Sequence, residues 1–343
     1  MSARFATNGE LLNWNSLVLN GSGGGSIFSS FQYGEIKRST DYKPLRVINK
    51  GAAFTILEKN TALGKLWYIP KGPSASSVGE LHNIIIGLRP LAKKRRVFTI
   101  RIESELPLSE APKLEKLSYV KTAPIIPSAS TITLDISGDE AEILVNIPQK
   151  GRHAIKRAER DGVKVKEMAC TEENCRQMYS LLEETAAGQF GIRNYDYYKT
   201  YWQTFQNAGL GQLFFAYYEG RVVSGAFALI FGENSIYKDG ASIRQRTAYG
   251  ASHLLQWHLI CWAKSRGAKI HDFCGSPPSS EINNQGHPHY GIGRFKLSFS
   301  KNVVDYIGCY DYPISRLCFF LWQHGIERLT RRAYYKRTGD YYY

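Results

Sequence analysis

The sequence predicts an α/β protein built from two successive units of similar construction. The chain has 343 residues, which is long for a single hydrophobic core. Two stretches, 44–103 and 213–273, repeat one order of elements: extended strands, then a helix, then another strand. Because residue identity between the stretches is weak, this repeated order is the evidence for a duplicated unit.

In the first stretch, alternation of apolar and polar side chains and a Pro-Lys-Gly-Pro turn at 70–73 delimit the elements. We expect strands at 44–58 and 66–69, a helix at 78–91 and a strand at 97–103. In the second stretch, the Glu219-Gly220 turn indicates a hairpin. We expect its strands at 213–218 and 222–231, followed by a strand at 235–241, a helix at 252–266 and a strand at 269–273.

Three helices are expected between these stretches. The strongest covers 149–162, with Gly162 where a glycine commonly ends a helix. The second covers 173–187, and the third covers 195–208 with Asn194 as its cap. The polar face of the first of these helices is basic: Lys150, Arg152, Lys156, Arg157 and Arg160.

The tail, 314–337, has the pattern of a basic amphipathic helix, which can dock on a core or lie on an anionic surface. We favour docking, because three of its aromatic side chains carry too much apolar surface to leave in water: Phe319, Phe320 and Trp322. No charged heptad pattern interrupts the second half, so no coiled-coil arm is expected.

The charge balance is strongly basic. There are 44 Lys and Arg residues against 30 Asp and Glu, a formal net charge of +14 with a pI near 9.4. Such a surplus attracts nucleic acid, phosphorylated substrates or an anionic membrane face, although a merely basic soluble protein remains the alternative.

The six cysteines form no Cys-x-x-Cys pair, which favours reduced thiols and a cytoplasmic protein. Cys274, His271, His287 and His289 are residue types that can bind a metal, but their spacing matches no common zinc pattern. We therefore expect no metal and no cofactor. Residues 1–10 show no signal peptide and no apolar run is long enough to span a membrane, while peripheral contact with the inner membrane face stays open. The oligomeric state is left open, with a monomer favoured.

Five ordered segments together resemble one family. They are 31–37 (Phe-Gln-Tyr-Gly-Glu-Ile-Lys), the basic helix and its end at 150–163, Gly191-Ile192-Arg193-Asn194 with Tyr197-Tyr198, the helix and strand of 250–275, and Gly293-Arg294-Phe295-Lys296 with Phe299. This set is similar to the FemABX family of peptidoglycan-bridge aminoacyltransferases, and the matches spread over about residues 28–313.

The resemblance implies a fold of two tandem GNAT-like domains with a cleft between them. It assigns 1–147 with 305–343 to a first, muropeptide-side domain, because the family's C-terminal segment returns there. It assigns 148–304 to a second domain on the side of the tRNA or acyl donor. The implied reaction moves an amino acid from aminoacyl-tRNA to the stem-peptide amine of a peptidoglycan precursor, either lipid II or UDP-MurNAc-pentapeptide.

Family positions carried over to this chain give the candidate site. Lys37 and Arg193 match positions that bind substrate phosphates, and Tyr197 and Tyr237 match aromatic positions near the muropeptide. Phe295-Lys296 matches the pair at the tRNA end, where Phe295 would stack on a base and Lys296 would neutralise charge at the ester. Each assignment has a structural alternative. Lys37 could be a solvated lysine, and Tyr197 and Tyr237 could be packing residues. The segment of Phe295 could be an amphipathic strand with Lys296 in solvent.

Lys150, Arg152, Lys156 and Arg157 are candidate tRNA contacts, with a solvated helix face as the alternative. No general base stands out: Glu103 sits near an acidic position of the family pattern, and Cys274 as a nucleophile has no partner at a recognisable spacing.

Two other functions were weighed. One is an N-acyltransferase that uses acyl-CoA or an acyl carrier. The pyrophosphate loop of such enzymes corresponds here to Arg246-Thr247-Ala248-Tyr249-Gly250-Ala251, and a side chain at Tyr249 would obstruct close backbone approach. The other is a non-catalytic RNA-binding protein, against which the absence of a known RNA-binding signature argues.

Overall fold

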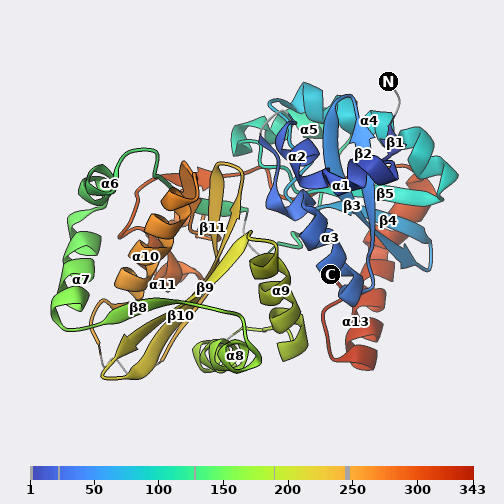
Figure 1. The fold of residues 1–343 in the computed structure, drawn as a ribbon. Coiled ribbons are helices and arrows are strands. Elements are labelled where there is room, and N and C mark those ends of the chain that lie inside the picture. The colour runs from blue at the N-terminus through green and yellow to red at the C-terminus, as the bar shows by residue number, and fades with distance from the viewer. Residues whose placement is uncertain (1–2, 22–23, 127–128, 189, 244–247) are drawn as a thin grey trace. The chain divides into compact units, whose positions relative to one another are not determined.

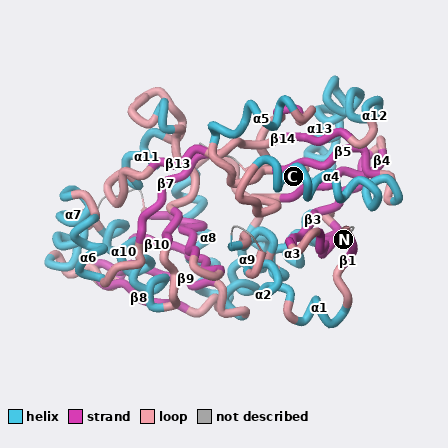
Figure 2. The backbone as a smooth tube through the Cα atoms, turned by 90° about the horizontal axis from the view of Figure 1, so that it is seen from above, coloured by secondary structure: helices cyan, strands magenta, loops and turns pink. Residues whose placement is uncertain are grey.

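The computed structural model describes residues 3–343 except 22–23, 127–128, 189 and 244–247 (Figures 1 and 2). The chain divides into two compact units, the first formed by Met1–Ala129 with Asp305–Tyr343 and the second by Ser130–Val304. Each unit has a seven-stranded sheet and a hydrophobic core of its own. Within the described residues, no helix is long and apolar enough to cross a membrane.

The sheet of the first unit has the order β1-β2-β3-β4-β5-β14-β6. Its strands are β1 (Arg4–Phe5), β2 (Lys43–Asn49), β3 (Ala52–Thr61), β4 (Gly64–Ile69), β5 (Val97–Ile102), β6 (Val120–Lys121) and β14 (Tyr310–Pro313). Its helices are α1 (Asn8–Leu12), α2 (Trp14–Leu19), α3 (Phe31–Lys37), α4 (Val78–Lys94), α5 (Ala111–Lys116), α12 (Arg316–Leu321) and α13 (Glu327–Thr338). The strands β2, β3 and β4 form an antiparallel meander, α4 crosses over, and β5 returns parallel to β4.

The sheet of the second unit has the order β13-β7-β12-β11-β10-β9-β8. Its strands are β7 (Ser130–Asp135), β8 (Lys164–Met168), β9 (Gly211–Tyr218), β10 (Arg221–Phe231), β11 (Asn234–Ser242), β12 (Ile270–Asp272) and β13 (Val303–Asp305). Its helices are α6 (Glu140–Asn146), α7 (Gln149–Arg160), α8 (Glu172–Ala186), α9 (Tyr195–Asn207), α10 (Ala251–Ser265) and α11 (Tyr290–Lys296).

The two sheets are built in the same order. In the second unit β9, β10 and β11 form the antiparallel meander, α10 crosses over, and β12 returns parallel to β11. An antiparallel strand then pairs with the returning strand in each unit, β14 with β5 and β7 with β12. This repeat confirms the predicted two-unit α/β fold.

The observed boundary between the units differs from the expected one at residue 147. Strand β7 pairs with β12, so residues from Ser130 onward belong to the second sheet. Helix α6 follows β7 and contributes Ile143 to the second core. The sequence reasoning missed both elements, because each is only six or seven residues long and carries little periodic signal.

The tail forms two helices rather than one continuous helix. Gly325, at φ 141°, interrupts the helical geometry between α12 and α13. The predicted docking of the tail is confirmed for Phe319 and Trp322, which are 6% and 0% exposed. Phe320 is 55% exposed and is not docked. The expectation that all three aromatic side chains are covered is therefore wrong for Phe320.

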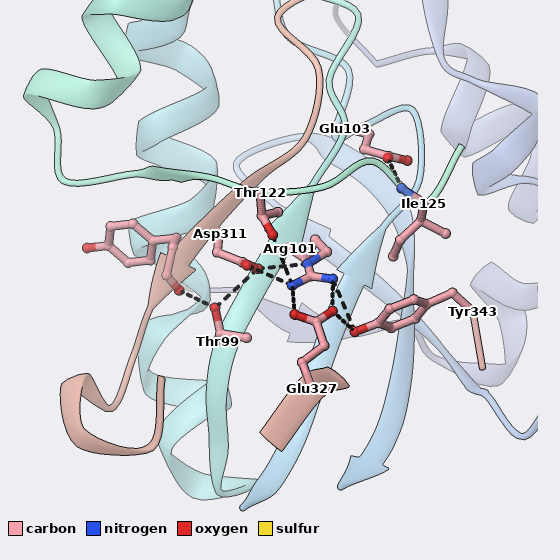
Figure 3. A network of polar contacts seen from close by, with 9 residues as sticks. Thr99, Arg101, Glu103, Thr122, Ile125, Asp311, Glu327 and Tyr343 are labelled. Atoms are coloured by element: carbon pink, nitrogen blue, oxygen red, sulfur yellow. Dashed lines mark hydrogen bonds and ion pairs between the residues drawn. The ribbon is translucent and has the colours of Figure 1, made fainter. Parts of the chain in front are cut away.

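One buried ion network ties the tail to the sheet of the first unit (Figure 3). The Arg101 guanidinium on β5 contacts the Asp311 carboxylate on β14 at 2.8 and 3.0 Å. It also contacts the Glu327 carboxylate of α13 at 2.8 Å and the Tyr343 hydroxyl at 3.1 Å. The side chains of Arg101 and Asp311 are 1% and 0% exposed, so water does not solvate either charge.

Replacing Arg101 should therefore destabilise the first unit strongly. Arg101→Leu leaves two carboxylates buried without their cation and should lower the free energy of unfolding by about 3–5 kcal/mol. Arg89→Leu, at an exposed position on α4, is the matched control. Urea unfolding measures both changes, and equal stability of the two variants would contradict the role assigned to Arg101.

Candidate functional site

A bulge in β11 places two charged side chains in the second unit. Tyr237 pairs with Ala228 and Asp239 pairs with Phe227, so Lys238 is the extra residue. Bulges of this kind re-aim side chains. The Lys238 ammonium lies 3.0 Å from one Asp239 oxygen, and the Trp202 indole N–H donates to the other at 2.9 Å. Burial lowers the pKa of Lys238, but Asp239 outweighs this effect and keeps that pKa above its usual value.

Helix α9 brings Arg193 and a row of aromatic rings to the same cluster. The Asn194 side chain caps α9 by accepting from the Tyr197 N–H at 2.9 Å, as the sequence predicted. The Arg193 guanidinium lies 4.8 Å from the centre of the Tyr197 ring. The charge of Lys238 is within electrostatic reach of Tyr197, Tyr198 and Cys274. Burial and Asp239 raise the pKa of Tyr198 to about 12.

Lys296 lies beneath the turn that follows β12. It ends α11 and is 5% exposed. Its ammonium donates to the carbonyl oxygens of Cys274 and Gly275 at 2.8 and 2.6 Å. Burial lowers the pKa of Lys296, and the neighbouring Cys274 and Asp272 only partly offset this. The alternative of an amphipathic strand with Lys296 in solvent is wrong, because the segment is helical and the lysine is buried.

The turn itself is held in an uncommon conformation. Cys274 has φ 62°, in the left-handed region that side chains rarely adopt. The Asp272 carboxylate accepts the Cys274 N–H at 2.6 Å and also the Thr131 hydroxyl of β7. These contacts direct the carbonyl groups of the turn toward Lys296.

Phe295 and Tyr237 lie partly inside the second core. The Phe295 ring is half-buried and packs edge-on against His253 and Phe299, with centroid distances of 5.0 and 5.4 Å. Tyr237 is also half-buried, and a Cβ on Gly240 would lie only 1.6 Å from its hydroxyl oxygen. Glycine at that position therefore makes room for the tyrosine. Burial and Asp239 together raise the pKa of Tyr237.

Lys37 belongs to the first unit and has a cluster of its own. It ends α3, is 7% exposed, and its ammonium lies 5.6 Å from the Tyr33 ring centre. Burial, Glu103 and Tyr33 raise the pKa of Tyr68. The Glu103 carboxylate accepts the Tyr68 hydroxyl and the Ile126 N–H, the latter at 3.1 Å. It also accepts the Ile125 N–H at 2.6 Å (Figure 3). With these donors on both oxygens, Glu103 acts as a buried anchor for the loop.

The four basic residues expected to contact tRNA do not share one role. Arg152 donates to the Ile147 carbonyl at 2.6 Å, and Arg157 pairs with Asp161 at 3.3 Å. Lys156 is exposed on α7. Lys150 lines a cavity of about 240 Å³ that also presents Arg294 and Lys301.

The cavity beside Lys150 carries three cations and no acidic side chain in its lining. Its lining residues are Pro148, Lys150, Asn283, Tyr290, Arg294, Leu297, Ser298 and Lys301. Arg294 lies on α11, two residues before Lys296, so the basic cavity and the buried lysine share one short helix. Neither Lys150 nor Lys301 has an ion pair within the described part of the chain.

Two further sequence expectations concern α10 and the histidines. Arg246 and Thr247 of the compared pyrophosphate loop lie outside the described residues. Tyr249 is 52% exposed and its ring lies 4.6 Å from the Arg157 guanidinium. The His271 ring nitrogens contact Ser235 Oγ and Gln256 Nε2 at 2.8 and 2.7 Å. Among the described residues, no group of three or more His, Cys, Asp or Glu side chains could hold a metal.

The structure thus places Arg193, Tyr197 and Lys296 in one region of the second unit, because Lys238 is within electrostatic reach of both Tyr197 and Cys274, the turn residue that Lys296 contacts. It adds Lys238 and Asp239, which the sequence reasoning missed. The sequence does show Lys238 and Asp239 as an adjacent pair of opposite charges inside the expected strand 235–241. That signal becomes specific only when the strand register reveals the bulge.

Comparisons with known proteins show which sequences and folds this chain resembles. Residues 149–290 match the family model described as an acetyltransferase (GNAT) domain. Lipid II:glycine glycyltransferase of Staphylococcus haemolyticus (strain JCSC1435) is 29% identical over 112 residues, 33% of this chain and 26% of that protein. The enzyme of the same name from Staphylococcus aureus (strain USA300) is 28% identical over 113 residues, with the same coverage. The matched region spans about a quarter of the length of these curated relatives.

Solved structures extend the likeness to nearly the whole chain. The crystal structure of FemX superposes with a TM-score of 0.78 and 17% identity, covering 95% of this chain and 100% of that one. L-PGS from Bacillus licheniformis superposes with a TM-score of 0.54 and 12% identity, covering 93% and 97%. At these identities the likeness establishes the fold.

The buried His271 gives a pH dependence to the second unit. Burial lowers the pKa of His271 to about 3, well below that of an unfolded histidine. Below pH of about 6.5 the unfolded chain takes up a proton that the folded chain refuses, so stability should fall as pH falls. His271→Gln should reduce this slope by about 1.4 kcal/mol per pH unit between roughly pH 6 and 4.

Urea unfolding at several pH values measures this slope. The exposed His153, changed to glutamine, is the matched control. An unchanged slope in His271→Gln would show that the buried imidazole is not the group responsible.

Proposed function

Because this chain is a FemABX-like protein of two GNAT-like domains, we propose that it transfers an amino acid from aminoacyl-tRNA to a peptidoglycan precursor. The acceptor is the stem-peptide amine of lipid II or of UDP-MurNAc-pentapeptide. Relatives named lipid II:glycine glycyltransferase support an aminoacyl transfer in the making of the peptidoglycan bridge. The proposal that the donor is an aminoacyl-tRNA is supported by the side chains of the second unit.

The observation that carries the proposal is the Lys296 ammonium at the turn after β12. An ammonium has three N–H donors, and two of them are directed to the carbonyl groups of Cys274 and Gly275. Among the described residues, the third N–H of the Lys296 ammonium has no acceptor within hydrogen-bond distance. A buried cation with a lowered pKa is suited both to stabilise an oxyanion and to release a proton.

The reaction can be written around this group. The acceptor amine attacks the ester carbonyl, and the new C–N bond forms as the C–O bond to the terminal ribose breaks. Lys296 gives a proton to the departing ribose oxygen and recovers one from the attacking nitrogen, so the enzyme is unchanged. Because the ester is already activated, alignment of the two substrates provides most of the catalysis.

The basic cavity supports an RNA donor. Lys150, Arg294 and Lys301 line it without acidic residues, which suits phosphodiesters. Arg294 and Lys296 share α11, so donor phosphates in the cavity lie along the helix that carries the reacting lysine. Phe295, between them, offers the exposed part of its ring to a terminal base.

In the second unit, a cation and tyrosines are available to hold the acceptor. Arg193, stacked on Tyr197, presents a guanidinium that can bind a phosphate bidentately. Tyr237 and Tyr197 would provide hydroxyls for the stem peptide. In the first unit, Lys37 at the end of α3 is a separate candidate cation for phosphate.

The second candidate is an acyl-CoA-dependent N-acyltransferase, which the match to an acetyltransferase domain favours. At the beginning of α10, where the pyrophosphate of coenzyme A would approach, Tyr249 carries a side chain whose ring lies 4.6 Å from the Arg157 guanidinium. We therefore rank this function second.

A transfer assay tests the proposal. The full chain is incubated with bulk tRNA charged with labelled amino acids and with lipid II or UDP-MurNAc-pentapeptide. A mass increase of one amino acid on the precursor, abolished by ribonuclease, is expected. No increase with either precursor, together with acyl transfer from acyl-CoA to an amine, would move the protein to the second candidate.

Three alanine variants should separate the roles of the site residues. Lys37→Ala and Arg193→Ala should raise the acceptor KM at least about ten-fold with little change in kcat, because they remove phosphate contacts made in ground and transition states alike. Lys296→Ala should instead lower kcat by about 100-fold or more. Steady-state kinetics with circular dichroism as a folding control measures this, and wild-type kinetics in all three would refute the residue assignment.

The cations of the basic cavity should govern tRNA affinity. The triple variant Lys150→Ala, Arg294→Ala, Lys301→Ala should weaken tRNA binding at least about ten-fold and reduce the slope of log K against log salt by about 2–3. The control replaces three exposed cations of the first unit with alanine: Arg89, Lys93 and Lys116. Equal salt slopes in both triple variants would exclude the cavity as the phosphate site.

A further inference from the structure

The C-terminal segment is fixed to the first unit by only one of its sides. Trp322 and Phe319 are buried, and the Glu327 carboxylate pairs with the buried Arg101. Tyr342, near the chain end, is 6% exposed and its hydroxyl donates to the Asn60 carbonyl. In Figure 1 this segment, drawn in red, includes the labelled helix α13.

The same segment also exposes large apolar side chains to water on both α12 and α13. Leu317 is 70% exposed and Leu329 is 64% exposed, and three further residues share this exposure: Phe320, Leu321 and Tyr335. An exposed apolar group of this size that lies beside charged residues commonly marks an interaction surface.

The charges around these side chains are almost all positive. The basic residues between 314 and 343 are Arg316, Arg328, Arg331, Arg332, Lys336 and Arg337. The acidic residues are Glu327 and Asp340, and Glu327 is neutralised by Arg101. Arg328, Arg332 and Lys336 are spaced four residues apart on α13, so they form a row on one face, with Leu329 beside it. Together with the exposed apolar residues they form what we call the C-terminal surface.

We propose that the C-terminal surface binds the interface of an anionic lipid bilayer. Basic side chains are attracted to anionic headgroups, while leucine and aromatic side chains enter the boundary between headgroups and acyl chains. Since no described helix can span a membrane, the segment lies on the bilayer rather than crossing it.

Two other occupants fit the surface less well. A second copy of this chain would bring two strongly positive surfaces together. A polynucleotide would satisfy the arginines but would leave Leu317, Leu329 and Phe320 against a charged backbone. The bilayer interface is the partner that satisfies both kinds of side chain. This inference does not depend on the transferase activity, because it concerns where the first unit is held.

Vesicle co-sedimentation of the full chain tests the proposal. Vesicles of phosphatidylcholine with roughly a third phosphatidylglycerol should bind the protein at least about ten-fold more tightly than pure phosphatidylcholine vesicles. Arg332→Glu with Lys336→Glu should reduce binding to the anionic vesicles at least about ten-fold. The control, Arg89→Glu with Lys116→Glu, changes the net charge by the same amount on the same unit and should stay within about two-fold of wild type.

A second pair of variants tests the apolar part. Leu317→Gln with Leu329→Gln should weaken binding several-fold even at high salt, whereas Leu12→Gln, at an 87% exposed position on α1, should not. The neutral variant Arg332→Gln with Lys336→Gln repeats the charge test should the glutamate variant unfold. Equal vesicle binding by the surface and control variants would overturn the proposal. So would tRNA binding that is lost with the arginines while the wild-type protein fails to bind anionic vesicles.

Discussion

The geometry of the second unit depends on how one buried cation is held. Lys296 is almost fully covered, and its charge is compensated by two carbonyl groups at hydrogen-bonding distance. Those carbonyls point the right way only because Cys274 adopts a left-handed conformation, which the Asp272 carboxylate stabilises through the Cys274 N–H. Asp272 is in turn fixed by Thr131 of the neighbouring strand. The chain of contacts thus runs from the sheet through a strained turn to α11.

The two units have the same strand order, but their buried charged residues are arranged differently. At the centre of the first sheet, Arg101 is neutralised by Asp311 and Glu327, and Glu103 accepts hydrogen bonds on both of its oxygens. That arrangement is closed and serves stability. In the second unit, Lys238 on β11 pairs with Asp239, and the Lys296 ammonium on α11 is compensated by two carbonyl groups. This difference is the physical reason for proposing that transfer takes place in the second unit.

Local patterns predicted much of this fold. The helix ending at Gly162 and the Asn194 cap both follow from residue-level preferences, and the structure has Gly162 at φ 91° and the capping hydrogen bond at 2.9 Å. The alternation and turn residues also gave the repeated strand-helix-strand order. These features depend on neighbours within a few positions along the chain.

The features that sequence reasoning missed depend on distant partners. The bulge that re-aims Lys238 exists only in the register between β10 and β11. The short strands β7 and β14 are defined by their pairing with β12 and β5. Phe295 and Lys296 suggested a strand because a short segment cannot distinguish periods of 2 and 3.6, and the helix is revealed by its packing. For Phe320, apolar character suggested burial, but the break at Gly325 and the docking of Trp322 leave it exposed.

The second unit is proposed to hold the 3′ end of an aminoacyl-tRNA. This proposal is tested most directly by the dissociation constant for tRNA carrying its amino acid through a stable amide in place of the ester, measured with and without coenzyme A. We expect tight binding of this tRNA that coenzyme A does not displace, and much weaker binding of uncharged RNA of the same length. Displacement of the tRNA by coenzyme A at the latter's own dissociation constant would contradict it.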